Sequence, residues 1–258
     1  MELSTVTYRV EENVAVISMN RPKAMNALNL QIFKDLTTAF EAARDDAAVR
    51  CVILAGEGRA FCAGGDIPEM KGLDTEKAVF DFYNIAGIFM TLLINFPKPV
   101  IAAAQGAIAG AGTSLIMACD ITLVADNASF IVAFGAVGLI PDCAGHWLLP
   151  RVVGPNVAKE LTMTQRPVKA DEMKALHLAN KVVPAEELMG AAMKMAKKIA
   201  NGPLNCYASS KTLINKAHET TLDVLLKEET EKQTAARLHK NGDEGLAAFL
   251  EKRPANFQ

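Results

Sequence analysis

The fold of this chain is most clearly indicated by residues 99–125, which read PVIAAAQGAIAGAGTSLIMACDITLVA. The first 21 of these residues carry no charge, a length that could span a bilayer. Three glycines and a glutamine interrupt them, however, and their β-branched start is typical of a strand. We therefore predict a buried strand over Pro99–Ala104, a turn, a helix over Gly110–Ala118 and a second strand over Ile121–Ala125.

The same alternation of strands and helices is found on the N-terminal side of this stretch. Two β-rich runs separated by a short polar segment predict a hairpin, and further apolar runs show strand or helix spacing. The predicted elements are strands over Val6–Val10, Val14–Met19 and Val49–Ala55, and helices over Asn29–Arg44 and Ala78–Ile94. Such alternation indicates an α/β core, because parallel strands need long crossover connections.

From Ala185 onward the sequence shows only helical spacing. We predict helices over Met189–Ala200, Leu204–Ala217 and Leu222–Leu238. These helices are expected to form an appendage that packs on the α/β core or on a neighbouring subunit.

Composition and charge argue against several classes of protein. In 258 residues, 27 Lys and Arg oppose 29 Asp and Glu, a net charge of -2 that argues against a nucleic-acid binder. The N-terminus lacks the basic and apolar segments of a secretory signal. The five cysteines are odd in number, far apart and without a C-x-x-C pair. We therefore expect a cytoplasmic protein with free thiols and no membrane partner.

Several familiar catalytic motifs are missing from the sequence. There is no G-x-S-x-G, no Walker-type loop and no G-x-G-x-x-G after the first strand, which disfavours hydrolase, kinase and dinucleotide-binding functions. The four histidines form no H-x-x-x-H pair, so we predict no metal site.

Two loops rich in small residues each follow a predicted strand, Arg59–Ile67 and Gly106–Gly112. The second loop opens a helix, where unpaired backbone N–H groups and the helix dipole favour negative charge. Two such loops could direct two N–H donors at one oxygen atom. Either loop could instead serve only the close packing of backbones.

Four motifs occur in order along the chain: NRPKAMNAL at 20–28, FCAGGD at 61–66, PKPVIAA at 97–103 and FLEKR at 249–253. Together they resemble the crotonase superfamily, the enoyl-CoA hydratase/isomerase family. The resemblance implies an α/β fold, a crotonase-like spiral of ββα units with a C-terminal helical region. Residues 1–195 would form the acyl-CoA-binding core, and residues 196–258 the region used for assembly into a homotrimer or a dimer of trimers.

The resemblance also implies an acyl-CoA thioester as the ligand and assigns residues to it. Two backbone N–H groups would polarise the thioester carbonyl, and by position they belong to Gly65 and Ala111. The CoA moiety would lie along Ala63, Gly65, Asp66 and Ile67, with Lys23 and Arg59 near its phosphates and Lys252 reaching it from a C-terminal helix. No cofactor is implied, because coenzyme A is part of the substrate.

The two glutamates that a hydratase of this family uses are replaced here. Ser114 and Phe134 occupy the corresponding positions, and neither can act as a carboxylate base. Asp142 stands where isomerase branches carry a carboxylate, and residues 138–151 are similar to the branch of the oxepin-forming phenylacetyl-CoA isomerases. The resemblance therefore favours an isomerase.

One carboxylate suffices to move a double bond, because the same group can remove a proton beside the thioester and return it two carbons further along. Burial of Asp142 would raise its pKa and improve such a proton shuttle. The side chains expected to bury it are Leu139, Ile140, Trp147 and Leu148. Phe134 and Trp147 are also expected to shape the acyl pocket.

We therefore predict an enoyl-CoA isomerase that shifts a double bond from the 3,4 to the 2,3 position, with Asp142 as the proton shuttle. Three alternatives stay open. Asp142 could merely cap a helix that starts near Cys143. The protein could be a hydratase in which Asp142 and another group activate water. It could also be a non-catalytic relative that binds acyl-CoA or RNA.

Overall fold

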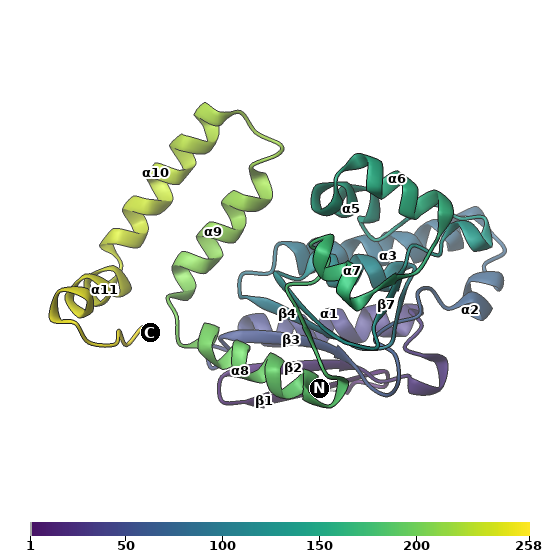
Figure 1. The fold of residues 1–258 in the computed structure, drawn as a ribbon, viewed down its shortest axis with the longest axis horizontal. Coiled ribbons are helices and arrows are strands. Elements are labelled where there is room, and N and C mark those ends of the chain that lie inside the picture. Colours follow the sequence, from purple (N-terminus) through teal and green to yellow (C-terminus); the bar gives the residue numbers. More distant parts are fainter. Residues whose placement is uncertain (1) are drawn as a thin grey trace.

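A six-stranded sheet lies at the centre of the computed structural model, which describes residues 2–258 (Figure 1). In spatial order its strands are β1 (Val6–Glu11), β2 (Val14–Met19), β3 (Cys51–Gly56), β4 (Val100–Ala104), β6 (Ile121–Ala125) and β9 (Lys181–Val183). β1 and β2 form an antiparallel hairpin, and all other neighbouring strands are parallel. The predicted hairpin and the predicted α/β core are confirmed.

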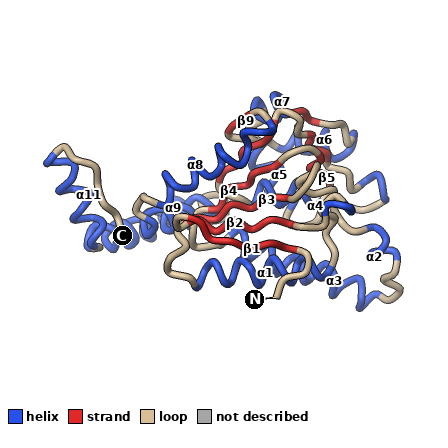
Figure 2. Tube along the Cα trace, turned by 90° about the horizontal axis from the view of Figure 1, so that it is seen from below, coloured by secondary structure: helices blue, strands red, loops and turns tan. Residues whose placement is uncertain are grey.

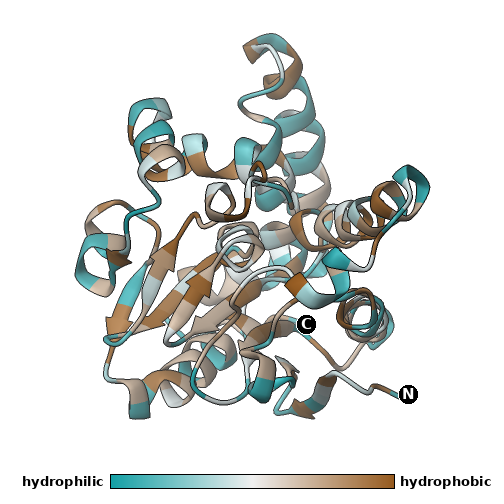
Figure 3. Ribbon diagram, turned by 90° about the vertical axis from the view of Figure 1, so that its right-hand side faces the viewer, coloured by the Kyte–Doolittle hydropathy of each residue, from teal (hydrophilic) through white to brown (hydrophobic). Residues whose placement is uncertain are grey.

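Helices cover both faces of this sheet, which explains why its central strands are apolar on both sides (Figures 2 and 3). Val14, Val16 and Ile53 pack against α8, whereas Ile17 and Leu54 point into the main core on the opposite face. The helices of the main core are α1 (Leu30–Asp45), α3 (Glu76–Ile94) and α4 (Ala111–Ala118), and the other face is covered by α8 (Leu188–Ala200).

A second sheet has three strands, β5 (Ala107–Ala109), β7 (Ser129–Ile131) and β8 (Val168–Lys169). The sequence did not predict them, because two or three residues show no usable alternation. Single β-bridges join Cys62 to Ile108 and Gly65 to Leu28. The first bridge joins the loop after β3 to β5, which follows β4, and the second joins the same loop to the segment before α1.

Four short helices also lie outside the predicted elements, although a helix starting near Cys143 was considered as an alternative. They are α2 (Ile67–Lys71), α5 (Gly145–Val153), α6 (Pro155–Thr164) and α7 (Ala170–Ala175). Single 3-10 turns occur at Pro22–Ala24, Gly135–Val137 and Ala185–Glu187. Helix α2 begins at the end of the Arg59–Ile67 loop, and α5 begins three residues after Asp142.

Helix α3 packs against α1 through aromatic side chains. The ring centroids of Phe33 and Phe82 lie 6.3 Å apart, and those of Phe40 and Phe89 lie 5.6 Å apart, both edge to face. By length and composition alone α3 could cross a membrane. One of its faces belongs to the protein core, however, while Phe80 and Ile88 form an exposed apolar surface on another.

The last three helices extend from the core as an arm, seen in yellow and light green in Figure 1. They are α9 (Leu204–Lys216), α10 (Leu222–Leu238) and α11 (Lys240–Glu251). Neither α9 nor α10, both described throughout, has a buried residue. An ion pair between Lys211 and Asp120 (3.0 Å) fastens α9 to the core.

The structure corrects the predicted boundary between the core, residues 1–195, and the C-terminal region, residues 196–258. That boundary would cut through α8, whose Ala196 and Ala200 are buried against the main sheet. The core therefore extends to Ala200, and the arm begins with α9.

Candidate active site

The two loops of small residues touch each other at a pair of glycines. Gly64 and Gly110 have positive φ angles of +101° and +50°. A Cβ atom on Gly64 would lie 3.1 Å from the carbonyl oxygen of Ala109, and one on Gly110 would lie 3.3 Å from the Cα atom of Gly64. Both the backbone conformation and the close approach require glycine at these positions.

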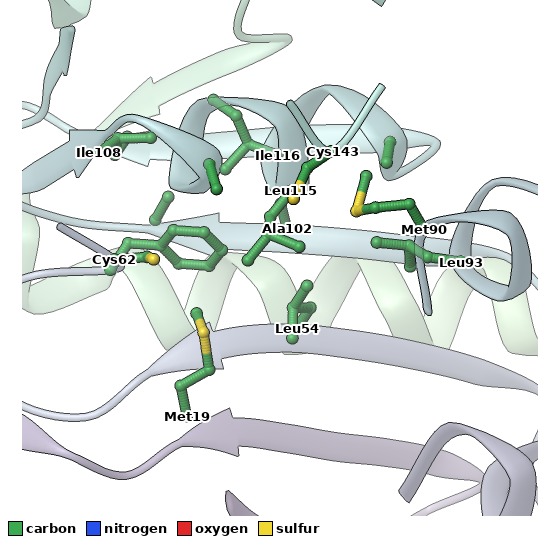
Figure 4. Packing of buried hydrophobic residues seen from close by; sticks show 14 of the residues in the cluster. Met19, Leu54, Cys62, Met90, Leu93, Ala102, Ile108, Leu115, Ile116 and Cys143 are labelled. Atoms are coloured by element: carbon green, nitrogen blue, oxygen red, sulfur yellow. The ribbon is translucent and has the colours of Figure 1, made fainter. Parts of the chain in front are cut away.

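Backbone pairing and burial hold the two loops together. The N–H group of Cys62 donates to the carbonyl of Ala107 (3.1 Å), and the N–H group of Ala109 donates to the carbonyl of Cys62 (2.9 Å). The first turn of α4 also packs on Cys62, since a Cβ atom on Gly112 would lie 2.6 Å from its carbonyl oxygen. Figure 4 shows Cys62 and Ile108 within this buried apolar layer.

Each loop presents a backbone amide directly after its contacting glycine. Among residues 2–258, the N–H groups of Gly65 and Ala111 have no hydrogen-bond acceptor. Ala111 is the first residue of α4, where N–H groups lack intrahelical partners and the helix dipole is positive. Two unpaired donors on touching loops are the arrangement that stabilises a developing oxyanion.

Asp142 offers a carboxylate on a loop that contacts α4, the helix that begins at Ala111. Its Oδ1 atom is buried and has no hydrogen-bond partner among residues 2–258. Burial raises the pKa of Asp142 above its usual value, although a hydrogen bond from the Cys143 thiol acts in the opposite direction. The capping alternative is wrong, because Ala144 is the N-cap of α5 and the helix has no side-chain cap.

The backbone that follows Asp142 is strained. Cys143 and Ala144 have φ angles of 49° and 61°, in the left-handed region that residues with a side chain seldom adopt. The hydroxyl group of Ser114, on α4, donates to the carbonyl of Asp142 over 3.1 Å. The residue at one of the two hydratase positions therefore contacts the loop of the predicted base.

The surroundings of Asp142 differ from those predicted. Leu139 and Ile140 are 38% and 75% exposed, so they contribute little to its burial. Tyr83 on α3 lies near Asp142 instead: burial raises the pKa of the tyrosine, and the negative charge of Asp142 raises it further. Phe134 belongs to the same buried cluster as Cys143. No sequence motif marks Tyr83, because its place depends on how α3 packs.

The side chain of Trp147 contacts Glu219 and Arg151. Its indole Nε1 donates to Glu219, and the guanidinium of Arg151 lies 3.9 Å from the centre of its ring. With Met117 and Ile214, Trp147 lines a groove of about 470 Å³ between α9 and the core. The role of Trp147 in the acyl pocket stays a prediction.

The predicted phosphate-binding cations, Lys23 and Arg59, lie on neighbouring surface loops. A Cβ atom on Gly58 would lie 2.9 Å from the Cβ atom of Pro22, which places the two loops in contact. Both cations are exposed. Of the other residues predicted along the CoA moiety, Ile67 is exposed and Ala63 is half-buried.

Asp66 has structural partners that the sequence analysis missed. Its carboxylate forms an ion pair with Arg21 (2.8 Å) and accepts a hydrogen bond from the N–H group of Glu69 (3.2 Å), which caps α2. The Arg21 guanidinium also donates to the carbonyl of Ala27. Arg21 lies within the motif at residues 20–28, so the sequence could have pointed to this arginine through that motif. The carboxylate of Asp66 therefore holds the loop in place.

Lys252 lies far from this site within its own chain. It follows α11 at the end of the arm, and Figure 2 shows α11 and α4 on opposite sides of the molecule. Lys252 therefore does not reach the site of its own chain, contrary to the prediction. The residue could serve only the site of another copy.

Comparisons with known proteins show which chains this one is similar to. The family model described as Enoyl-CoA hydratase/isomerase matches residues 9–258. The chain is 36% identical to the 1,2-epoxyphenylacetyl-CoA isomerase of Escherichia coli K12, with 96% of each chain covered. It is 37% identical to the crotonyl-CoA hydratase of Syntrophomonas wolfei, with 100% and 99% covered.

Solved structures show the same fold. An enoyl-CoA hydratase from Polaromonas sp. JS666 superposes with a TM-score of 0.95 and is 34% identical, covering 98% of this chain and 99% of its own. The family model, these relatives and the shared fold lead to one conclusion: the chain belongs to the enoyl-CoA hydratase/isomerase family of the crotonase superfamily.

Proposed function

We propose that this protein is an enoyl-CoA isomerase that shifts a double bond from the 3,4 to the 2,3 position of an acyl-CoA thioester. The observation that carries the proposal is the buried, unpartnered carboxylate oxygen of Asp142, on a loop held by Ser114 of α4, the helix that begins with the unpaired amide of Ala111. Ser114 and Phe134 supply no second carboxylate. The similarity to a 1,2-epoxyphenylacetyl-CoA isomerase supports isomerase chemistry on a CoA thioester.

The proposed reaction needs only this chain's own groups. The thioester oxygen accepts hydrogen bonds from the amides of Gly65 and Ala111, each typically worth about 3–4 kcal/mol in the transition state. The Asp142 carboxylate removes a proton from C2, and the electron pair of the broken C–H bond forms a dienolate. The protonated Asp142 then returns the proton to C4. Coenzyme A enters and leaves as part of the substrate, so no cofactor is consumed.

A panel of CoA thioesters tests this function. We expect the wild-type protein to convert a 3-enoyl-CoA into the conjugated 2-enoyl-CoA, measured by the ultraviolet absorbance of the conjugated thioester. Hydration of a 2-enoyl-CoA is expected to be at least about a hundredfold slower, because general acid–base groups typically contribute that much and both hydratase positions lack them. Rapid formation of 3-hydroxyacyl-CoA without isomerisation would contradict the proposal.

The second candidate function is hydration of a 2-enoyl-CoA. The similarity to named hydratases favours it. It would require Asp142 and one further group to activate water, because Ser114 and Phe134 cannot act as carboxylates. The same panel distinguishes the two functions, because hydration adds water and isomerisation leaves the mass of the thioester unchanged.

We also propose that the protein acts in the cytoplasm as a homotrimer or a dimer of trimers assembled through the arm. Leu238, Phe249 and Leu250 on or beside its last helices are 77%, 82% and 79% exposed in the single chain. Phe249 and Leu250 are adjacent in sequence, and large exposed apolar side chains of this kind are typical of an interface.

Joint replacement of Phe249 and Leu250 by serine is expected to shift the assembly towards a monomer, measured by analytical ultracentrifugation. Met163→Ser, at a side chain 76% exposed on α6, is the matched control and should leave the assembly unchanged. Sedimentation of the wild-type protein as a 27.6 kDa monomer would rule the proposal out.

A further inference from the structure

The carbonyl oxygen of Asp142 accepts two hydrogen bonds. One comes from the N–H group of Gly145 (2.8 Å), within the same turn, and the other from the hydroxyl group of Ser114 (3.1 Å) on α4. Among residues 2–258, the Ser114 bond is the only hydrogen bond that joins residues 138–144 to a segment distant in sequence. It therefore connects the loop of the proposed base to the core.

The side chain of Ser114 is tightly enclosed by this loop. Ser114 is fully buried. A Cβ atom on Gly145 would lie 3.1 Å from the Ser114 hydroxyl oxygen and 3.2 Å from the Cβ atom of Pro141. The loop thus lies directly on the hydroxyl group, and a carboxylate side chain at position 114 would have to displace it.

The loop needs such an attachment because its backbone is strained. The left-handed conformations of Cys143 and Ala144 are costly for residues with a side chain and persist only where surrounding contacts enforce them. The strained pair follows Asp142 directly. A contact that holds the Asp142 carbonyl therefore also fixes the direction in which the carboxylate points.

The same helix carries one of the oxyanion donors. Ala111 provides the unpaired amide at the start of α4, and Ser114 follows three residues later, about 4.5 Å further along the helix axis. α4 is buried between the sheet and α5, and Leu115 and Ile116 on it pack in the apolar layer shown in Figure 4. One buried helix therefore carries both the oxyanion donor, Ala111, and the serine that holds the loop of Asp142.

We propose that Ser114 is a positioning residue, whose hydroxyl group holds the Asp142 loop at a fixed distance from the Ala111 amide and keeps the free carboxylate oxygen facing the substrate. The inference rests on the proposed isomerase function, in which Asp142 must reach both C2 and C4 while the oxyanion stays bound. It gives the serine a role in this chain, at a position where the family's hydratases carry a glutamate.

Replacing Ser114 by alanine tests the inference through kinetics. We expect kcat for isomerisation to fall about tenfold to hundredfold, because small displacements of a catalytic group have effects of that size, while KM changes less than about twofold. Thr122→Ala is the matched control: its buried hydroxyl also donates to a carbonyl of α4, that of Ile116 (3.0 Å), at the far end of the helix. The control should retain wild-type kcat.

A measurement without turnover keeps the test independent of the proposed function. The protein is labelled with ¹³C at its aspartate carboxyl carbons, and the Asp142 signal is assigned by its loss in Asp142→Asn. In Ser114→Ala we expect the pKa of Asp142 to fall, because the released loop admits water. The titratable groups facing Asp142 are Tyr83 from α3 and Cys143, and burial keeps both neutral where a carboxyl titrates.

The outcomes separate the two proposals. If Ser114→Ala lowers both kcat and the Asp142 pKa while Thr122→Ala changes neither, the positioning role is supported. If Ser114→Ala titrates and turns over like wild type, the role is overturned while the isomerase function stands. A wild-type protein that does not isomerise, but whose Asp142 pKa still falls in Ser114→Ala, overturns only the isomerase function. Should Ser114→Ala not fold, Ser114→Cys replaces it, since a thiol fills the space and donates weakly.

Discussion

Replacing Asp142 with asparagine is expected to reduce kcat for isomerisation of a 3-enoyl-CoA by a factor of about 10² to 10⁴, the usual contribution of a general acid–base group. The amide cannot accept the C2 proton, whereas the oxyanion donors and the CoA-binding loops are untouched. KM is therefore expected to change little. Steady-state kinetics on the substrate panel measures both quantities.

Asp120→Asn is the matched control for this variant. Burial also raises the pKa of Asp120, but its carboxylate pairs with Lys211 and accepts from the N–H group of Val100, at the base of the arm. We expect Asp120→Asn to keep the wild-type isomerase rate. Retention of more than about a tenth of wild-type activity in Asp142→Asn would show that Asp142 is not the proton shuttle.

Asp142→Asn is also expected to change the stability of the protein, and this change depends on pH. Burial disfavours the ionised Asp142, so its pKa is higher in the folded than in the unfolded protein. Its stabilising contribution is present below the unfolded pKa, about 4, and is lost as pH rises through the folded pKa. Asp142→Asn should therefore increase the free energy of unfolding at pH 7, and the gain should vanish near pH 4, as measured by urea denaturation.

Replacing Gly64 with alanine is expected to lower kcat/KM by a factor of about 10² to 10³, the usual effect of losing one oxyanion donor. The new methyl group would lie 3.1 Å from the Ala109 carbonyl oxygen and 3.4 Å from the Cα atom of Gly110, so the two loops must separate. The Gly65 amide follows Gly64 directly and would move away from the thioester oxygen. The positive φ angle should also reduce the free energy of unfolding by about 1–2 kcal/mol.

Gly154→Ala separates the two expected effects of Gly64→Ala, the loss of stability and the loss of activity. Gly154 also has a positive φ angle, +79°, but a Cβ atom there would meet nothing within 4 Å. We therefore expect a comparable loss of stability and no loss of activity in Gly154→Ala. If Gly64→Ala and Gly154→Ala had the same kcat/KM in steady-state assays, the contact between the two loops would have no catalytic role.

Much of the fold and part of the site could be predicted from the sequence. Strands β2, β3 and β4 and helices α1 and α3 followed from apolar spacing, which is a property of neighbouring residues. The loop Gly106–Gly112 indicated an unpaired backbone amide for a related reason, because the first N–H groups of a helix have no intrahelical partner. The short strands β5, β7 and β8 could not be predicted, since they contain too few residues to show a period.

The sequence by itself determined the alternating α/β core, the two glycine-containing loops, the family resemblance and the presence of one carboxylate at position 142. Only the tertiary structure decided what surrounds that carboxylate: Tyr83 and Ser114 lie near it, whereas Trp147 lines a groove under α9. The physical reason is that backbone conformation is encoded over a few adjacent residues. The burial of Asp142 and the position of its loop depend on contacts such as that with Ser114, 28 residues away along the chain.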